Sequence, residues 1–208
     1  MKPILIGVCG GSGSGKSTLI KRLASEFKGN VTLLNMDSFY KPQPDTTYEQ
    51  RTKTNYDHPD SLDKDVMIKC IRDLSEGKDT LIPVYDFTIH NRSYKPWETV
   101  EAKELVIIDG ILLFAFPEIV EMLSLKIFVD ADDDVRILRR LLRDGRERAR
   151  SPESVVEQYL TTVKPIYELY VAPHKKDADI VVPEGGKNEG ALRLICDALK
   201  YRLSQEAE

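Results

Sequence analysis

The sequence predicts an α/β fold in which helices cover both faces of a parallel sheet of about five strands. Short apolar runs alternate along the chain with segments of helical spacing. Most runs are apolar at every position instead of every second one, which is typical of strands buried on both faces. A glycine-rich segment directly follows the first run, and a helix-like segment follows the glycines. Together these three observations predict an α/β sandwich.

Taken in chain order, the expected strands are six apolar runs. They cover residues 4–8, 31–35, 80–84, 105–109, 125–129 and 179–182. Between and after these runs apolar residues recur every three or four positions, as they do on one face of a helix. The expected helices cover residues 16–28, 62–75, 118–123, 133–150, 153–171 and 188–203.

Polar and aromatic residues follow several of the expected strands. In an open α/β sheet, ligands gather at the carboxyl ends of the strands. Such residues come after the strands at 31–35, 80–84 and 105–109. Segment 41–61 contains several prolines and aromatic residues and is long for a structureless connection. We therefore expect it to be a functional loop or lid.

Composition narrows the class of protein. The 208 residues, of which 41% are hydrophobic and 31% charged, suit one domain spanning 1–208. A net charge of −4 does not favour nucleic acid or an acidic membrane surface as a partner. No run reaches the roughly 18 apolar residues of a membrane span. Cys9, Cys70 and Cys196 lie far apart, so we expect reduced thiols in a cytoplasmic protein.

The glycine-rich segment fits the phosphate-binding pattern G-x-x-x-x-G-K-[ST]. It consists of Gly10, Gly11, Ser12, Gly13, Ser14, Gly15, Lys16 and Ser17, and Thr18 continues into the helix. Backbone N–H groups of such a loop surround phosphates, and the helix N-terminus adds positive charge. Lys16 would contact the β- and γ-phosphates, and Ser17 would help hold Mg²⁺. A flexible Gly/Ser loop is the alternative, but the flanking strand and helix favour a nucleoside triphosphate site in a P-loop NTPase sandwich.

Two aspartates at strand ends are candidates for the chemistry. Leu105–Ile108 followed by Asp109 is a Walker B pattern, whose carboxylate holds Mg²⁺. Many buried strands end in aspartate, so this pattern gains weight only beside a P-loop. Asp37 follows the second strand and is our candidate base for accepting a hydroxyl proton. An N-cap or Asx-turn role is the alternative for Asp37.

A second group of residues has the chemistry of an acceptor pocket. Asp57 could accept hydrogen bonds from vicinal sugar hydroxyls, although Asp57–Pro59 is also typical of a turn. His90 and Tyr85 could bind the edge of a base while an aromatic ring stacks on its face. A structural role is the alternative for His90.

Arginines are concentrated between positions 136 and 150 of an otherwise acidic chain. Helical spacing puts Arg136, Arg139, Arg140 and Arg143 partly on one face. A lid at about 139–160 that closes arginines over a triphosphate would also exclude water. A solvated basic helix and a nucleic-acid-binding patch are the alternatives, but no aromatic platform accompanies the arginines.

These motifs resemble the uridine kinase (uridine–cytidine kinase) family of P-loop kinases, from Ile4 to about Leu203. The resemblance rests on segments 10–17, 37–41, 53–59, 83–87, 109–112, 128–130, 158–159, 163–165 and 178–180. Asn55-Tyr56-Asp57-His58-Pro59 and Pro83-x-Tyr85-Asp86-Phe87 are specific to uridine kinases within the P-loop proteins.

The resemblance implies transfer of a phosphoryl group from ATP or GTP, with Mg²⁺, to the 5′-hydroxyl of uridine or cytidine. It implies that Asp37 is the base, and that Asp57, Arg143 and Gln158 lie near the sugar. The residues that it places around the pyrimidine are Tyr40, Tyr56, Tyr85, Phe87, His90 and Ile111. The lid arginines that it implies are Arg140, Arg148 and Arg150, with Lys16 and Arg143 counted as catalytic. It also implies a homotetramer.

The chain departs from the family pattern at two positions. Asp109 stands where the family usually has Glu, so the carboxylate lies farther from a bound metal. Ala149 stands where the lid usually has Gly, which stiffens the backbone.

Two other functions compete with a nucleoside kinase. The first is a kinase of the same group that acts on a phosphorylated sugar or on pantothenate. The second is a nucleotide-dependent switch or a catalytically silent regulatory protein. A GTPase-like switch would need an N-K-x-D motif, and Lys187-Asn188-Glu189-Gly190 is not one.

Overall fold

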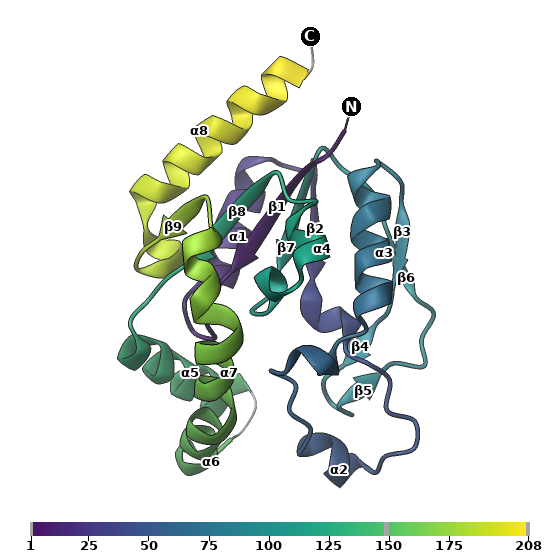
Figure 1. Cartoon of the computed structure of the whole chain (residues 1–208), viewed down its shortest axis with the longest axis vertical. Helices are drawn as coiled ribbons and strands as arrows, with labels where there is room; N and C mark the ends of the chain where they lie inside the picture. Colours follow the sequence, from purple (N-terminus) through teal and green to yellow (C-terminus); the bar gives the residue numbers. More distant parts are fainter. Residues whose placement is uncertain (1, 148–149, 207–208) are drawn as a thin grey trace.

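A five-stranded parallel sheet forms the centre of the computed structural model, which describes residues 2–147 and 150–206. The strand order is β2-β7-β1-β8-β9, and every pairing in this sheet is parallel. The strands are β1 (Ile4–Cys9), β2 (Val31–Asn35), β7 (Leu105–Asp109), β8 (Leu125–Val129) and β9 (Ile180–Val182). The predicted fold class is confirmed (Figure 1).

Helices cover both faces of this sheet. The α-helices are α1 (Lys16–Glu26), α2 (Tyr48–Thr52), α3 (Lys64–Ser75), α4 (Pro117–Val120), α5 (Asp133–Glu147), α6 (Pro152–Gln158), α7 (Lys164–Ile166) and α8 (Glu189–Glu206). Ile4, Ile6 and Val8 of β1 pack in one core with α1 and α8. Leu5 and Cys9 pack in the other core with α3, α4 and α7. Burial on both faces is why the strand is apolar throughout.

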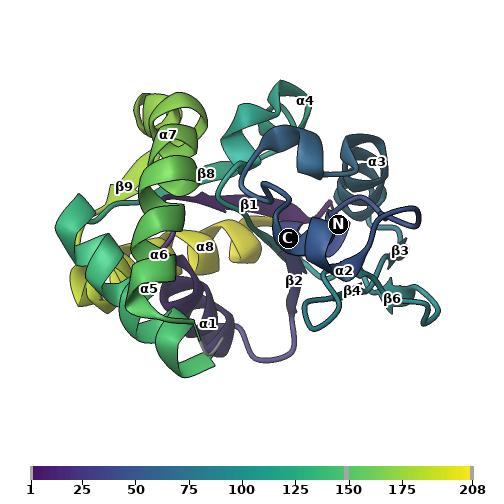
Figure 2. The ribbon, with the colours of Figure 1, turned by 90° about the horizontal axis from the view of Figure 1, so that it is seen from below.

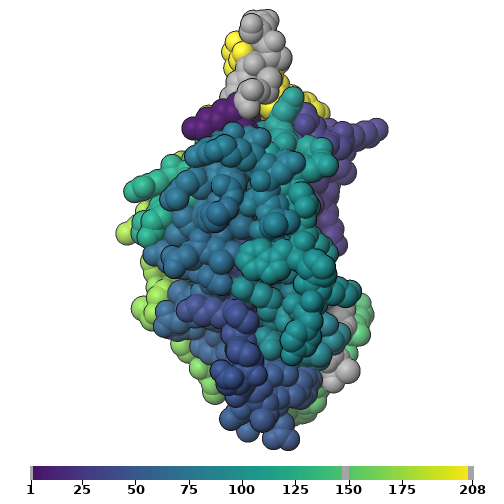
Figure 3. All heavy atoms as spheres, turned by 90° about the vertical axis from the view of Figure 1, so that its right-hand side faces the viewer, coloured from purple at the N-terminus to yellow at the C-terminus, as the bar shows by residue number. Residues whose placement is uncertain are grey.

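The expected strand at 80–84 lies outside the parallel sheet. β3 (Thr80–Ile82) pairs antiparallel with β6 (Glu98–Val100). A second small sheet consists of β4 (Tyr85–Asp86) and β5 (Asn91–Arg92). The sheet of β3 and β6 lies beside α3, and β4 and β5 lie below the lower end of α3 in Figure 1. Figure 3 looks at this side of the molecule, which the blue and teal segments cover. The residues that follow β3 therefore reach the site through a hairpin and not as the end of a central strand.

Two other segments differ from expectation. The long helix expected at 153–171 consists of α6 and α7 with two π-helical stretches, Tyr159–Val163 and Tyr167–Val171. Pro165 lies inside this run and has no N–H to donate to a helical hydrogen bond. The expected loop at 41–61 contains α2, whose capping box is made by Thr47 and Gln50.

The carboxyl ends of the central strands are flanked by two groups of elements. Seen from below, α5, α6 and α7 lie on one side, and α2 and β4 lie on the other (Figure 2). The P-loop begins where β1 ends, so it lies at this edge of the sheet.

The connection between β9 and α8 packs directly against the P-loop. Gly185 has a φ of +75°, and a Cβ added there would lie 2.1 Å from the Ser14 carbonyl oxygen. Gly186 approaches the start of α1, where an added Cβ would lie 2.4 Å from the Leu19 nitrogen. Arg22 of α1 donates to the Gly186 carbonyl oxygen and pairs with Glu189 at 2.6 Å. The second half of the chain thereby supports the phosphate-binding loop.

Replacing Gly185 by alanine tests this support. We expect Gly185→Ala to lower the free energy of unfolding by about 3 kcal/mol, because a left-handed backbone conformation and a clash with backbone add together. Gly29→Ala is the matched control, since Gly29 has a φ of +80° but nothing within 4 Å of an added Cβ. It should cost only about 1 kcal/mol. Equal losses in urea denaturation would contradict the proposed contact.

Candidate active site

Lys16 lies inside the curve of the P-loop. Gly15, in a left-handed conformation, directly precedes α1, and Lys16 is the first residue of the helix. The Lys16 side chain is buried, and its Nζ donates to the Gly10 carbonyl oxygen at 2.9 Å. Ser17 and Thr18 follow in the first turn and are exposed. The loop thus presents an ammonium group and a helix N-terminus at one place, as phosphate binding requires.

Asp109 lies beside Ser17. It ends β7, and in the register of the sheet it is the partner of Val8 on β1. Ser17 Oγ donates to Asp109 Oδ2 at 3.5 Å. Removal from water raises the pKa of Asp109, while Lys16 and the Ser17 hydrogen bond oppose that rise. A hydroxyl and a carboxylate beside a phosphate-binding loop are oxygen ligands of the kind that Mg²⁺ shares with phosphates and water, so these residues fit the ion.

Asp37 lies at the same edge, in the short 3-10 helix Met36–Phe39 that follows β2. The Asn35 side chain caps this turn by accepting the Asp37 N–H at 2.9 Å. The capping role considered for Asp37 therefore belongs to Asn35. The Asp37 carboxylate instead accepts a hydrogen bond from the Tyr40 hydroxyl at 3.2 Å.

The electrostatic surroundings of Asp37 perturb its titration. Removal from water is the largest cause that raises its pKa, and the Asp109 carboxylate adds to it. The Tyr40 hydrogen bond and Lys16 lower the pKa, and the more distant Asp57 raises it again. Perturbation by burial together with charged neighbours in a cleft is a mark of functional sites. Lys16 lowers the pKa of both Asp37 and Asp109, which agrees with their position at one edge of the sheet.

An asparagine side chain caps the backbone N–H of Asp57 as it does that of Asp37. The Asn55 side chain accepts the Asp57 N–H at 3.1 Å, which repeats the Asn-x-Asp turn at 35–37. Asp57 lines a small cavity together with residues of the P-loop, the end of β7 and the α6–α7 helix. The other lining residues are Gly11, Ser12, Ile111, Val163, Ile166, Tyr167 and Val171. Asp57 and Ile111 are thus both close to the phosphate-binding loop.

An aromatic cluster lies next to Asp37. Tyr40 makes edge-to-face contacts with Tyr56 and Tyr85, with ring centroids 5.1 and 5.0 Å apart. Tyr85 contacts Phe87 in the same manner at 5.1 Å. His90 stacks on Tyr56 at 6.0 Å, and the Tyr56 hydroxyl donates to the His90 carbonyl oxygen. The structure therefore brings together five of the six residues predicted to surround a base, and the exposed Phe87 ring lies at the margin of the cluster. The sixth, Ile111, lines the cavity beside the P-loop.

Three arginines of α5, Arg136, Arg139 and Arg140, lie against the P-loop, whereas Arg146 is exposed. Arg140 is buried and donates to Ser12 Oγ and to Gln158 Oε1, each at 2.9 Å. Arg139 donates to the Gly13 and Ser14 carbonyl oxygens at 3.3 Å. This arrangement does not fit a solvated basic helix.

Two further predicted arginines lie beside this group. Arg150 hydrogen-bonds to Gln158 Oε1 and to Ser154. Arg143 donates to the buried Asp144 carboxylate at 2.8 Å, so its guanidinium is directed along the helix. Arg148 and Ala149 lie outside the described residues.

Sequence reasoning missed several residues that shape the site. Asn35 and Asn55 present the two carboxylates, and the shared Asn-x-Asp spacing was a signal for them. Arg136 is buried, lies 3.8 Å over the Tyr167 ring and contacts Gly11 of the P-loop. The sequence singled out Arg136 only as one member of an arginine face. Gln43, which donates to the Tyr56 hydroxyl at 2.9 Å, carried no signal.

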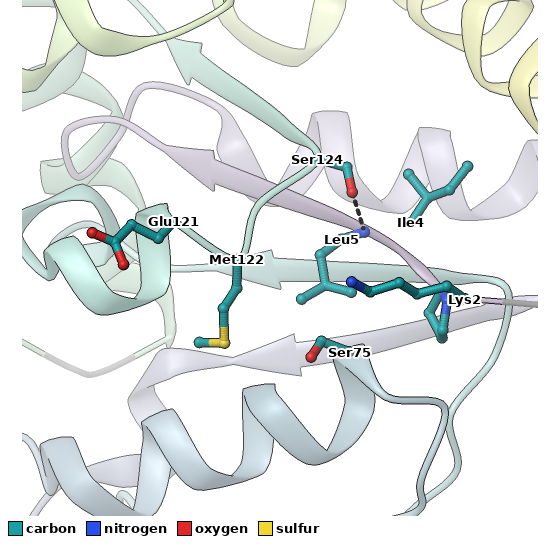
Figure 4. Close-up of a pocket in the computed structure, with 8 residues that line it drawn as sticks. Lys2, Ile4, Leu5, Ser75, Glu121, Met122 and Ser124 are labelled. Carbon is teal, nitrogen blue, oxygen red and sulfur yellow. Dashed lines mark hydrogen bonds between the residues drawn. The ribbon is translucent and has the colours of Figure 1, made fainter.

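A larger cavity lies away from these residues. It has a volume of about 300 Å³ at the amino end of β1 and is lined by Lys2, Pro3, Ile4, Leu5, Ser75, Glu121, Met122 and Ser124. Figure 4 shows these residues and the hydrogen bond from the Leu5 N–H to Ser124. None of the predicted site residues lines it.

The described residues contain neither a ready-made metal cluster nor a membrane-spanning helix. Within residues 2–147 and 150–206, no three His, Cys, Asp or Glu side chains cluster so that they could hold a metal by themselves. No helix in that part of the chain is long and apolar enough to span a membrane.

Known proteins resemble the chain over nearly its whole length. The model of the Phosphoribulokinase / Uridine kinase family matches residues 5–191. A uridine kinase from Clostridium novyi (strain NT) is 45% identical over 206 residues, which are 99% of both chains. One from Ligilactobacillus salivarius (strain UCC118) is 47% identical over 93% of this chain and 91% of its own. The structure of phosphoribulokinase from Rhodobacter spheroides has a TM-score of 0.65 at 17% identity, covering 88% of this chain and 70% of that one, which is a likeness of fold alone.

The buried carboxylates predict a stability change for Asp37→Asn. Folding raises the pKa of Asp37, so the folded state favours the protonated carboxyl group. As far as this group is concerned, the protein has its full stability below the unfolded-state pKa of about 4, and it loses stability as the pH rises from there through the folded-state pKa. The asparagine variant does not undergo this loss. We expect it to be more stable than wild type by about 1 kcal/mol at pH 7, with the difference shrinking toward pH 4.

Thermal unfolding at a series of pH values measures this difference. Asp45→Asn is the control, since Asp45 is exposed on the 41–61 segment. A difference for Asp37→Asn that does not change with pH would contradict the electrostatic account.

Proposed function

The chain belongs to the phosphoribulokinase/uridine kinase family, and we propose that it is a uridine kinase that phosphorylates uridine and cytidine at the ribose 5′-hydroxyl. ATP or GTP is the phosphoryl donor in this proposal, with Mg²⁺. One observation carries it: Asp37 follows β2 at the same edge of the sheet where Asp109 ends β7 and the P-loop with Lys16 follows β1. The full-length identity with proteins named uridine kinase supports uridine as the acceptor.

The proposed roles follow from the chemistry of each group. Asp37 accepts the proton of the 5′-hydroxyl as that oxygen bonds to the γ-phosphorus, and the nucleoside diphosphate leaves. The Tyr40 hydroxyl holds the Asp37 carboxylate in place. The P-loop backbone from Gly10 to Thr18 and Lys16 bind the triphosphate. Ser17 and Asp109 would hold Mg²⁺, which neutralises phosphate charge when bound.

The remaining predicted residues bind the acceptor nucleoside or belong to the lid in this proposal. Asp57 binds the ribose hydroxyls in this proposal, with Arg143 and Gln158 near the sugar. The aromatic cluster of Tyr40, Tyr56, Tyr85, Phe87 and His90 encloses the pyrimidine in this proposal, and Ile111, which lines a cavity with Asp57, contacts the nucleoside from that side. Arg140, Arg148 and Arg150 close over the phosphates within a lid at about 139–160. Arg140 donates hydrogen bonds to Ser12 and Gln158, and Arg150 donates one to Gln158. These hydrogen bonds support the proposed lid.

Four finer points stay predictions. They are the acceptance of cytidine beside uridine, a homotetrameric assembly, a cytoplasmic location and one domain spanning 1–208. The three cysteines, all free and buried, agree with a reducing compartment.

An acceptor panel tests the proposed function. Purified protein is given ATP and Mg²⁺ with uridine, cytidine, adenosine, a phosphorylated sugar and pantothenate, and the products are identified. We expect UMP and CMP to form and the other three acceptors to be left unchanged. Phosphorylation of the sugar or of pantothenate in place of uridine would favour another kinase of the group, and no product from any acceptor would favour a regulatory protein.

The role of Asp37 predicts a specific kinetic loss. Asp37→Asn removes the proton acceptor but keeps the size of the side chain, so we expect kcat with uridine to fall about 10²- to 10⁴-fold. The affinity for ATP, measured by calorimetry, should stay near that of wild type, because the P-loop is untouched. Asp45→Asn is again the control. A variant whose turnover stays within a few-fold of wild type would remove Asp37 from the role of base.

Asp57 offers a matched pair of variants within one turn. Asp57→Asn should raise the KM for uridine about 10-fold, since a charged acceptor of two sugar hydroxyls becomes neutral. Asp60→Asn, three residues on, alters a carboxylate that is 90% exposed and should leave the KM unchanged. The KM for ATP is the internal reference for both. Equal uridine KM values for the two variants would argue against Asp57 as the ribose ligand.

A further inference from the structure

Arg92 connects three segments of the proposed acceptor pocket. It lies on β5, where it is the partner of Tyr85 in the hairpin that also carries Phe87 and His90. Its Nη2 atom donates to the Tyr40 carbonyl oxygen at 3.0 Å and to Asp63 Oδ2 at 3.1 Å. One guanidinium group therefore joins the hairpin to the turn that carries Asp37 and to the residue before α3.

The guanidinium of Arg92 is enclosed by protein. Its side chain is only 12% exposed, and its Nε atom is buried without a hydrogen-bond partner among the described residues. The Trp97 ring lies over it, with 5.6 Å between the guanidinium carbon and the ring centroid. Trp97 belongs to the connection between β5 and β6 and is itself 41% exposed. An aromatic face over a partly desolvated cation is attractive and keeps water away from the Asp63 pair.

Tyr40 makes this arrangement relevant to the acceptor. Its carbonyl oxygen accepts from Arg92, its hydroxyl donates to Asp37, and its ring contacts Tyr56 and Tyr85. A shift of Arg92 would therefore change the distance between the aromatic cluster and Asp37. Other backbone contacts, such as Asp63 N–H to the Phe39 carbonyl oxygen at 2.8 Å, keep the fold of the turn in place without Arg92.

We propose that Arg92, held between Trp97 and the acceptors Tyr40 and Asp63, is a positioning residue that sets the base-binding hairpin relative to Asp37 and thereby determines how tightly the acceptor nucleoside binds. We name this group of four residues the Arg92 clasp. The proposal rests on the proposed function, because it gives the clasp a role in binding the acceptor nucleoside and none in binding the triphosphate. It also accounts for Trp97, the one tryptophan of the sequence.

Steady-state kinetics of four variants test the acceptor role. Arg92→Gln removes the charge and Trp97→Leu removes the covering ring. Arg72→Gln and Tyr94→Leu are the matched controls, since Arg72 is exposed on α3 and Tyr94 is 96% exposed in the same connection as Trp97. We expect the KM for uridine to rise about 10-fold in Arg92→Gln and about 3-fold in Trp97→Leu. The KM for ATP should change less than about 2-fold, since the clasp does not touch the P-loop.

The double variant separates a clasp from two independent residues. If Trp97 acts through Arg92, Arg92→Gln with Trp97→Leu should raise the uridine KM less than the product of the two single effects. A product of the single effects, equal rises in the KM for uridine and ATP, or an unchanged uridine KM in folded Arg92→Gln would each overturn the proposal. If Arg92→Gln does not fold, the uridine KM of Trp97→Leu is compared with that of Tyr94→Leu, and equal values would overturn the proposal.

Fluorescence distinguishes a failure of the clasp from a failure of the proposed function. Because Trp97 is the one tryptophan, selective excitation reports on this site alone. We expect Arg92→Gln to shift the Trp97 emission and Arg72→Gln to leave it unchanged. A wild-type protein that phosphorylates no nucleoside would overturn the proposed function and, with it, the acceptor role of the clasp. An active wild type whose Trp97 emission is the same in Arg92→Gln would overturn the clasp alone.

Discussion

The close approach of backbone to backbone around the phosphate-binding loop is the constraint on which the rest of the structure depends. An added Cβ would lie 2.3 Å from the Val129 carbonyl oxygen at Gly10 and 2.4 Å from that of Arg136 at Gly13. The glycines of the motif thus serve the surrounding protein as well as a bound phosphate, since β8 and α5 reach the loop only where side chains are missing. Because the first turn of α5 lies against the loop, Arg136, Arg139 and Arg140 are directed toward it.

The second constraint is electrostatic. Asp37 and Asp109 both lie near Lys16 of the P-loop, and burial raises the pKa of both carboxyl groups. Such a grouping opposes folding, because like charges are held in a poorly solvated place. The protein maintains it through short turns in which an asparagine side chain accepts the N–H of the aspartate two residues later. This grouping lowers the stability of the protein, and it places a partly buried carboxylate beside the lysine of the P-loop.

Local patterns were sufficient to predict much of this architecture. The fully apolar runs predicted the parallel sheet, and the motif predicted where the phosphate-binding loop lies, because both depend on a few adjacent residues. The run at 80–84 was assigned to the same class of strand, although β3 pairs antiparallel with β6 outside the central sheet. The π-helical turns after Gln158 and the contact of Arg92 with Tyr40 left no periodic signal. They arise from packing between segments that are far apart in sequence, which residue spacing does not encode.

The parallel topology also decides how the protein can be handled. Since all five central strands run in one direction, the loops at their carboxyl ends project to one pole, whereas β1 begins and α8 ends at the other (Figure 1). A solid support or a fusion partner joined through α8 would therefore be held at the far pole. An immobilised preparation made in this way keeps both groups of elements around the P-loop exposed to the surrounding solution.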